Sequence, residues 1–164
     1  MIPIRGLFET HLTVSDLERA KKFYGGVLGL ELAQEFPERD VAFYWLGGRG
    51  ASMLGLWPGP GLEPVGAAPQ RPSLHMSLHI ALRVDLPDLL RAPAALRAAG
   101  VTPLDFAGNP TEEPVVLAWM PAGSLYFRDP DGNLIEFLAM LPDAPEPKLG
   151  VVGWSAWCGR GGAR

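Results

Sequence analysis

Two histidines and one glutamate lie in strand-like segments among apolar neighbours. His11 is in the segment "HLTV", His79 in "LHIAL" and Glu136 in "LIEFLAM". Imidazole and carboxylate groups exchange protons and bind metal ions, and burying either group without a partner costs free energy. A lone histidine on a strand most often has a structural role or faces solvent. Glu136, between Ile135 and Phe137, is therefore expected to have a partner that neutralises its carboxylate. The chemistry depends on which partners the fold supplies.

The segment around His11 is predicted to be a strand that leads into a helix. Residues 7–14 alternate between a mostly apolar face and a polar face that carries His11 and Thr13. Ser15 and Glu18 then have the spacing of a capping box, which starts a helix. That helix should end at the glycines between 25 and 29. The residues that it is expected to bury are Leu17, Ala20, Phe23, Tyr24 and Val27.

The same order of elements occurs in the second half of the chain. Residues 77–84 alternate and place His79 and Arg83 on the polar face. A helix is predicted over 87–99, with Pro93 expected to kink or restart it. The strand candidates are 31–36, 41–46 and 52–57 in the first half, and 101–106, 115–120, 124–128 and 134–140 in the second. The second half has one candidate too many, so one of its runs is expected to be an insertion.

Composition excludes several classes of protein. The net charge of −4 without any basic run argues against a nucleic-acid surface. Cys158 is the only cysteine, which excludes an intrachain disulfide and a CxxC site. No signal peptide is evident, and no apolar run approaches the roughly 20 residues that span a bilayer. A soluble protein of the cytoplasm, without a membrane or nucleic-acid partner, is expected.

Proline and glycine divide the chain. The run "WPGPGLEPVGAAPQRP" cannot be a regular helix or a central strand, so it is interpreted as a linker. A second such run, "LPDAPEP", detaches the end of the chain. The 164 residues are therefore expected to form a single domain. Its parts are a first module of about 5–57, a linker of 58–74, a second module of about 75–140 and a tail of 141–164.

Together these segments resemble the vicinal-oxygen-chelate superfamily, which includes glyoxalase I, extradiol dioxygenases, fosfomycin-modifying thiol transferases and bleomycin-resistance proteins. The resemblance rests on "HLTVSDLERAKKFYGGVLGLEL", "HIALRVD", "LRAAGV" and "SLYFRDPDGNLIEF". It implies an α+β fold of two βαβββ modules, whose curled mixed sheets form a cleft for a divalent metal.

The resemblance also implies the metal ligands. Family members have a ligand on the first strand of each module and another on the last strand of the second, which correspond here to His11, His79 and Glu136. Such a triad leaves coordination positions open and suits Fe²⁺, Mn²⁺, Zn²⁺ or Ni²⁺. His75 is a weaker candidate for the position of His79.

Four further residues are candidates for contact with a substrate. The resemblance implies that Tyr126 is a catalytic residue that binds or polarises substrate, with an ordinary half-buried strand aromatic as the alternative. Thr13, Ser124 and Arg83 are candidate substrate-binding residues, because each shares a polar face with one of the implied ligands or with Tyr126. For these three the alternative is a solvated strand face.

Each well-known activity of the superfamily lacks one expected part. Glyoxalase I has a fourth, basic glutamate on the last strand of its first module, where this sequence has Leu54 or Leu56. Fosfomycin enzymes hold the phosphonate with lysine and arginine, and residues 112–123 contain neither. Two-domain extradiol dioxygenases carry an acid–base histidine further from the second ligand than His75 is from His79.

The expected function is that of a divalent-metal-dependent enzyme, of lyase or dioxygenase type, which chelates vicinal oxygens of a small molecule. The alternatives are a drug-sequestering binding protein of the bleomycin-resistance type and a fosfomycin-type thiol transferase. Four apolar residues could form the walls of the cleft, although a core role is favoured for most of them: Phe43, Trp45, Met53 and Trp57.

A homodimer is also expected, because relatives of this size commonly pair. The site then lies within one chain or is shared between two. Trp154 and Trp157 in the tail either clasp the partner chain or pack back onto the tail's own sheet.

Overall fold

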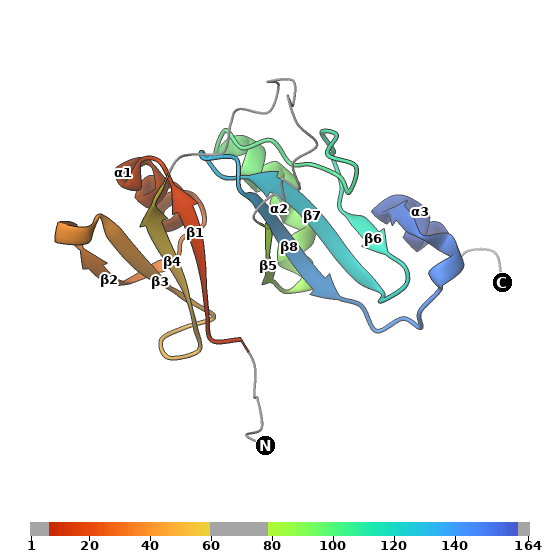
Figure 1. Ribbon diagram of the computed structural model, residues 1–164. Helices are drawn as coiled ribbons and strands as arrows, with labels where there is room; N and C mark the ends of the chain where they lie inside the picture. The colour runs from red at the N-terminus through yellow and green to blue at the C-terminus, as the bar shows by residue number, and fades with distance from the viewer. Residues whose placement is uncertain (1–6, 60–78, 161–164) are drawn as a thin grey trace, which may run out of the picture. The chain divides into compact units, whose positions relative to one another are not determined.

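Residues 7–59 and 79–160 are the part of the chain that the computed structural model describes (Figure 1). They divide into two units with one sheet each. Unit 1 contains residues 7–59 together with the turn Asp129–Asn133, and unit 2 contains 79–128 and 134–160. Residues 60–74 of the predicted linker, and His75, lie outside the described residues.

The sheet of unit 1 has four strands in the order β1-β4-β3-β2. Strand β1 runs parallel to β4, and the other neighbours are antiparallel. In chain order its elements are β1 (Glu9–Val14), α1 (Leu17–Lys21), the π-helix η1 (Lys22–Val27), β2 (Glu31–Phe36), the 3₁₀ turn η2 (Pro37–Arg39), β3 (Val41–Leu46) and β4 (Ser52–Pro58).

The sheet of unit 2 has five strands in the order β5-β8-β7-β6-β9, with only β5 and β8 parallel. Its first four strands repeat the order found in unit 1, so the predicted α+β fold of two βαβββ modules is confirmed. In chain order the elements are β5 (His79–Arg83), α2 (Leu86–Ala98), β6 (Val115–Leu117), β7 (Ala122–Arg128), β8 (Leu134–Met140), the 3₁₀ turn η3 (Pro147–Leu149), β9 (Val151–Gly153) and α3 (Trp154–Gly159). Among the described residues, no helix is long and apolar enough to cross a membrane.

The first helix ends at Val27, within the predicted range of 25–29, but its cap and the burial of one residue differ from the prediction. Asp16, not Ser15, caps it by accepting a hydrogen bond from the Arg19 amide, because Ser15 is occupied elsewhere. The helix continues as η1 through the first glycines, and Val27 at its end is 38% exposed rather than buried.

Helix α2 is continuous from Leu86 to Ala98, so it is not restarted at Pro93. Its buried face includes Leu89, Pro93 and Leu96, and packing against the sheet outweighs the backbone hydrogen bond that proline removes.

The fold shows which strand candidate is not a strand and where the tail packs. Residues 101–106 form no strand, since only Leu104 bridges to Tyr126 and to Pro110. The tail adds β9 to its own sheet by pairing with β6. Trp157 is 5% exposed and packs in a cluster with Val116. The alternative in which the tail returns to its own sheet is therefore confirmed.

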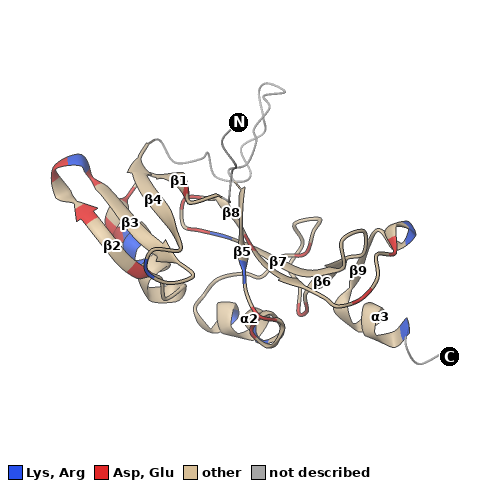
Figure 2. Ribbon diagram, turned by 90° about the horizontal axis from the view of Figure 1, so that it is seen from below, with Lys and Arg blue, Asp and Glu red and all other residues tan. Residues whose placement is uncertain are grey.

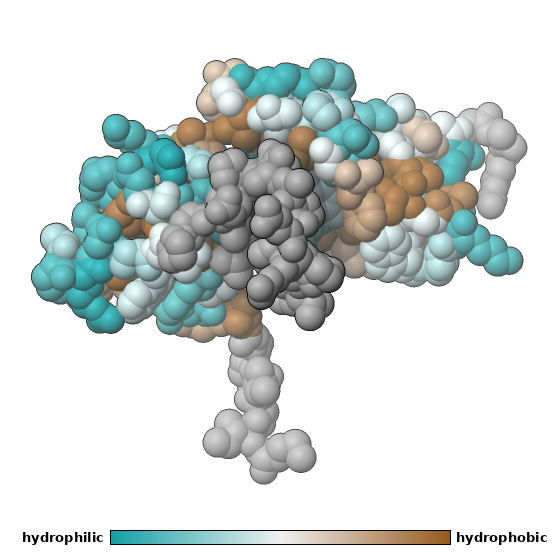
Figure 3. All heavy atoms as spheres, turned by 45° about the horizontal axis from the view of Figure 1, so that its top comes forward, coloured by the Kyte–Doolittle hydropathy of each residue, from teal (hydrophilic) through white to brown (hydrophobic). Residues whose placement is uncertain are grey.

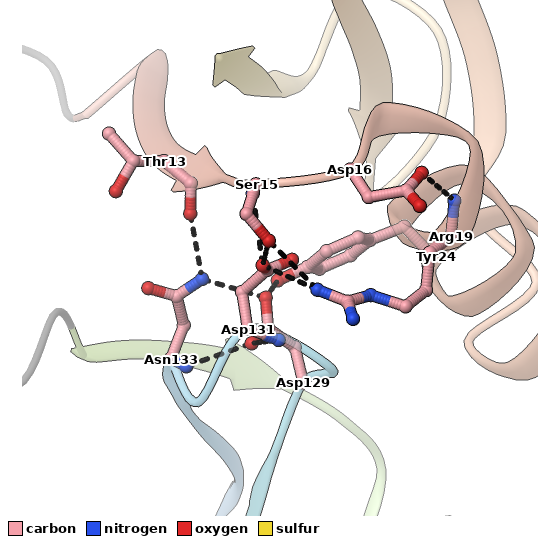
Figure 4. A network of polar contacts seen from close by, with 8 residues as sticks. All are labelled: Thr13, Ser15, Asp16, Arg19, Tyr24, Asp129, Asp131 and Asn133. Atoms are coloured by element: carbon pink, nitrogen blue, oxygen red, sulfur yellow. Dashed lines mark hydrogen bonds and ion pairs between the residues drawn. The ribbon is translucent and has the colours of Figure 1, made fainter. Parts of the chain in front are cut away.

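The turn Asp129–Asn133 is held in unit 1 by buried hydrogen bonds (Figure 4). The Tyr24 hydroxyl donates to Asp129 Oδ2 at 2.8 Å. The Asn133 side-chain amide donates to Asp129 Oδ2 at 2.7 Å and to the Thr13 carbonyl at 3.1 Å. Burial, followed by the Asp129 carboxylate, raises the pKa of Tyr24 far above its usual value, so the phenol remains a donor.

A second carboxylate of this turn ties it to the start of α1. Asp131 Oδ1 accepts hydrogen bonds from the Ser15 amide at 2.9 Å, the Ser15 hydroxyl at 2.5 Å and an Arg19 guanidinium nitrogen at 2.8 Å. We refer to Thr13, Ser15, Arg19, Tyr24, Asp129, Asp131 and Asn133 as the turn network.

Candidate functional site

Glu136 lies at the centre of a polar cluster on the sheet of unit 2. Glu136 is 4% exposed and lies on β8, the strand between β5 and β7. The register places Tyr126 directly opposite Glu136, with Ser124 two residues earlier on the same face of β7. His79 is two residues from Ala81, which pairs with Glu136 on the other side. The pairing of three strands thus gathers all four side chains.

Both carboxylate oxygens of Glu136 have a partner. The Ser124 hydroxyl donates to Oε1 at 2.5 Å, and His79 Nε2 lies 3.1 Å from Oε2. Ser124 is fully buried, whereas the His79 side chain is partly exposed. A carboxylate is tolerated in a buried position only where its oxygens have hydrogen-bond or ionic partners. The contacts of Glu136 with Ser124 and His79 therefore agree with the expectation that it has such partners.

Tyr126 belongs to the same cluster. Burial raises its pKa to about 12, and the Glu136 carboxylate also raises it, while a hydrogen bond with Ser124 acts in the opposite direction. The phenol therefore keeps its proton at neutral pH and can donate a hydrogen bond. Its ring centroid is 6.1 Å from that of His79.

His11 lies on a half-buried aromatic face of unit 1. The rings of Trp57 and Phe43 have their centroids 5.4 Å and 6.1 Å from that of His11. Glu9 Oε1 lies 3.3 Å from His11 Nε2. The strand pairing places Phe43, Trp45, Met53 and Trp57 on this face. None of the four belongs to the buried core, so the core role that the sequence favoured is wrong.

The sequence matched Leu54 or Leu56 to the position of the basic glutamate of glyoxalase I, and the structure corrects this match. Leu54 and Leu56 are fully buried on the opposite face of β4, and Gly55 is the residue paired with His11. Strand β4 presents Met53, Gly55 and Trp57 to the His11 side, so no carboxylate of this strand faces His11. The run "SMLGLW" is apolar at nearly every position, and its sequence could not show which residues face which side.

Gly55 is needed because the space above it is filled by rings. A Cβ at this position would lie 2.8 Å from His11 Cδ2 and 3.0 Å from both Phe43 Cε1 and Trp57 Nε1. We expect Gly55→Ala to lower the free energy of unfolding by about 1–3 kcal/mol through overpacking. Gly26→Ala is the control, because its Cβ would meet nothing within 4 Å. Urea unfolding of the two variants measures the difference, and equal stabilities would contradict the crowding of His11.

Of the other two predicted substrate-binding residues, Thr13 belongs to unit 1, and Arg83 belongs to unit 2 together with the Glu136 cluster. Thr13 is half-buried on the His11 face of β1, and its backbone carbonyl belongs to the turn network. Arg83 is exposed at the end of β5, on the same face as His79. Sequence reasoning missed the pairing of Glu9 with His11, although the two-residue spacing on one strand face could have indicated it.

The donor chemistry of these residues fits a divalent transition metal. Neither unit by itself gathers three His, Cys, Asp or Glu residues into a metal-binding group, within 7–59 with 129–133 or within 79–128 with 134–160. Unit 2 does hold an adjacent imidazole and carboxylate, His79 and Glu136, and unit 1 holds the imidazole of His11. Nitrogen and oxygen donors of this kind suit Zn²⁺, Fe²⁺, Mn²⁺ or Ni²⁺.

Comparison with known proteins gives consistent matches. Residues 6–137 match the model of the Glyoxalase/Bleomycin resistance protein/Dioxygenase superfamily. The chain is 32% identical over 139 residues to a lactoylglutathione lyase of Haemophilus influenzae, covering 80% of this chain and 90% of that protein.

Solved structures agree. An integron cassette protein from the mobile metagenome of the Halifax Harbour sewage outfall matches with a TM-score of 0.64 at 32% identity, over 84% of this chain and all of that one. A glyoxalase/dioxygenase from Nostoc punctiforme matches with a TM-score of 0.60 at 22% identity, over 84% and 92% of the two chains, which supports the fold alone.

Proposed function

Because the chain belongs to the Glyoxalase/Bleomycin resistance protein/Dioxygenase superfamily, we propose that it is a divalent-metal-dependent enzyme. Its substrate is a small molecule with two neighbouring oxygen atoms. His11, His79 and Glu136 hold the metal. When bound, the ion supplies positive charge that polarises the substrate oxygens. Lyase chemistry is favoured over dioxygenase chemistry, since the curated relative at 32% identity is a lactoylglutathione lyase.

The observation that carries this proposal is the buried carboxylate of Glu136. A residue only 4% exposed, with an imidazole 3.1 Å from one oxygen and a hydroxyl on the other, is costly to bury for structural purposes alone. A cation shared by the carboxylate and the imidazole offsets that cost. A drug-sequestering protein has no need of such a pair.

The remaining residues of the cluster have distinct roles in this proposal. Ser124 fixes the orientation of Glu136 through its hydrogen bond to Oε1. Tyr126 keeps its proton and donates a hydrogen bond to a substrate oxygen, which stabilises negative charge that develops there. Thr13 and Arg83 contact the substrate from the strand faces that carry the two histidines.

Glu9 replaces the basic carboxylate that β4 lacks. General-base proton abstraction needs a carboxylate near the reacting carbon. Glu9 is the carboxylate that contacts His11, at 3.3 Å, and its side chain is accessible. A proton taken from the substrate therefore passes to a Glu9 oxygen in this proposal.

Metal binding tests the proposal directly. The protein is loaded separately with Zn²⁺, Mn²⁺, Fe²⁺ and Ni²⁺, desalted, and its metal content and affinity are measured by mass spectrometry and competition with a chelator. We expect one ion per site in the wild type and at least a tenfold loss of affinity in His11→Ala, His79→Ala and Glu136→Gln. Glu112→Gln, an exposed carboxylate paired with Arg97, should bind like the wild type.

Two results would contradict this. A wild type that retains no stoichiometric ion would favour the drug-sequestering class. A Glu136→Gln variant that binds as tightly as the Glu112→Gln control would remove Glu136 from the ligand set.

The homodimer and the cytoplasmic location stay predictions, and light scattering measures the first.

A further inference from the structure

A row of aromatic rings continues outward from the Glu136 cluster in unit 2. The Tyr126 ring, 6.1 Å from His79, is also 6.1 Å from the ring of Phe106, which in turn is 6.3 Å from that of Trp119. Phe106 is 55% exposed and Trp119 is 42% exposed. Exposed apolar rings that adjoin a polar cluster mark a binding surface more often than isolated surface residues do. We refer to Phe106 and Trp119 as the aromatic ledge.

The exposure of Phe106 is fixed by a well-bonded loop. Leu104 and Tyr126 exchange two backbone hydrogen bonds, which anchor the loop beside β7. One residue before Phe106, an Asp105 carboxylate oxygen accepts from the amides of Ala107 and Asn109, both at 2.8 Å. These hydrogen bonds, with that from Asn109 first, lower the pKa of Asp105, so the carboxylate stays charged and bonded. These hydrogen bonds fix the backbone of the loop, and with it the exposed position of Phe106.

Neither ring of the ledge is charged, and the neighbouring carboxylates already have partners. Glu112 pairs with Arg97, Glu113 accepts from Ser155, and Asp105 accepts from amides of its own loop. Residues 112–123, which include Trp119, contain no lysine or arginine, and β6 carries only tan residues in Figure 2. In Figure 3, hydrophobic surface is conspicuous on the part of the molecule formed by unit 2. A phosphate or another anion would find no cationic partner on the ledge itself. The chemistry suits a neutral, planar group that can lie against two aromatic rings.

From this geometry we infer that the substrate carries an aromatic or other planar uncharged group, which packs on Phe106 and Trp119 while its two oxygens reach the Glu136 cluster. The inference rests on the proposed function for the oxygen end of the substrate. Tyr126 joins the two ends, since its ring contacts both His79 and Phe106. The ledge then selects substrates by their apolar part.

The test uses a naphthalene diol with adjacent hydroxyl groups as the probe, and calorimetry on the Zn²⁺-loaded full-length protein. We expect Phe106→Ala and Trp119→Ala each to weaken binding of the diol roughly three- to tenfold. Phe106→Leu, which keeps an apolar side chain without a ring, should weaken it as well. Leu90→Ala is the matched control, because Leu90 is 40% exposed on helix α2 of the same unit.

Further readouts separate failure of the ledge from failure of the metal site. The ledge is overturned if Phe106→Ala and Trp119→Ala bind the diol like Leu90→Ala while their Zn²⁺ affinity is unchanged. If the wild type does not retain Zn²⁺, the proposed function fails, and diol binding by the metal-free variants still tests the ledge. Loss of a wild-type dimer on light scattering in both ledge variants would assign the surface to a second copy of the chain and overturn the inference.

Discussion

Replacing Asp129 by alanine is expected to lower the free energy of unfolding by about 3–5 kcal/mol, because it removes the acceptor at the centre of the turn network. Asp129 Oδ2 accepts from the Tyr24 hydroxyl and the Asn133 amide. Its Oδ1 accepts from the backbone amides of Asp131 and Asn133 at 2.9 Å and 2.8 Å. The variant leaves these buried donors unsatisfied. Urea unfolding followed by circular dichroism measures the loss.

Asp143→Ala is the control for this prediction, since Asp143 is an exposed aspartate in a loop of unit 2. We expect it to change stability by less than about 0.5 kcal/mol. Tyr24→Phe, which removes one donor together with its hydrogen bond, should cost about 0.5–1.5 kcal/mol. If Asp129→Ala is as stable as Asp143→Ala, the turn network does not hold unit 1 together.

Trp157→Ala is expected to cost about 3–5 kcal/mol of stability, because it leaves a cavity in a buried cluster. Trp157 packs with Val116, Ala118 and Leu141, and the guanidinium of Arg160 lies over its ring. The side chain anchors α3 after β9 has paired with β6. Thermal and urea unfolding of the variant measure the effect.

Trp119→Ala provides a control of the same chemistry. Trp119 is a half-exposed tryptophan of unit 2, so its removal opens no cavity and should change stability by less than about 1 kcal/mol. The two variants thus separate a tryptophan that holds the fold from one that is available to a ligand. Equal losses in the two would show that the tail contributes no more to the core than a surface residue does.

The strands that could be predicted from sequence are those with clear alternation or clear boundaries. The ranges 31–36, 41–46 and 134–140 agree with β2, β3 and β8. They are bounded by glycine, proline and a tight turn, which end strands for steric reasons. Strand β9 was not predicted, because three residues between a proline-rich run and a helix carry no periodic signal of their own.

For the candidate site, the sequence indicated which residues carry chemistry but not which atoms meet. The expectation of a partner for Glu136 could be made because an acid among apolar residues of a strand must be neutralised. The identity of both partners depends on how β5 and β7 pair with β8, which is a long-range property. Whether His11 joins His79 and Glu136 at one ion stays a prediction, and the metal measurements above test it.

The turn network affects how the protein folds during its synthesis on the ribosome. The acceptor for the Tyr24 hydroxyl and the donor for the Thr13 carbonyl come from Asp129 and Asn133, which are synthesised long after β1 to β4. Domains usually fold from the N-terminal end as the chain emerges. Here the sheet of unit 1 is synthesised before the turn between β7 and β8, which supplies hydrogen-bond partners for its buried polar groups. Until that turn has been synthesised, we expect the sheet of unit 1 to be less stable and more accessible to proteases.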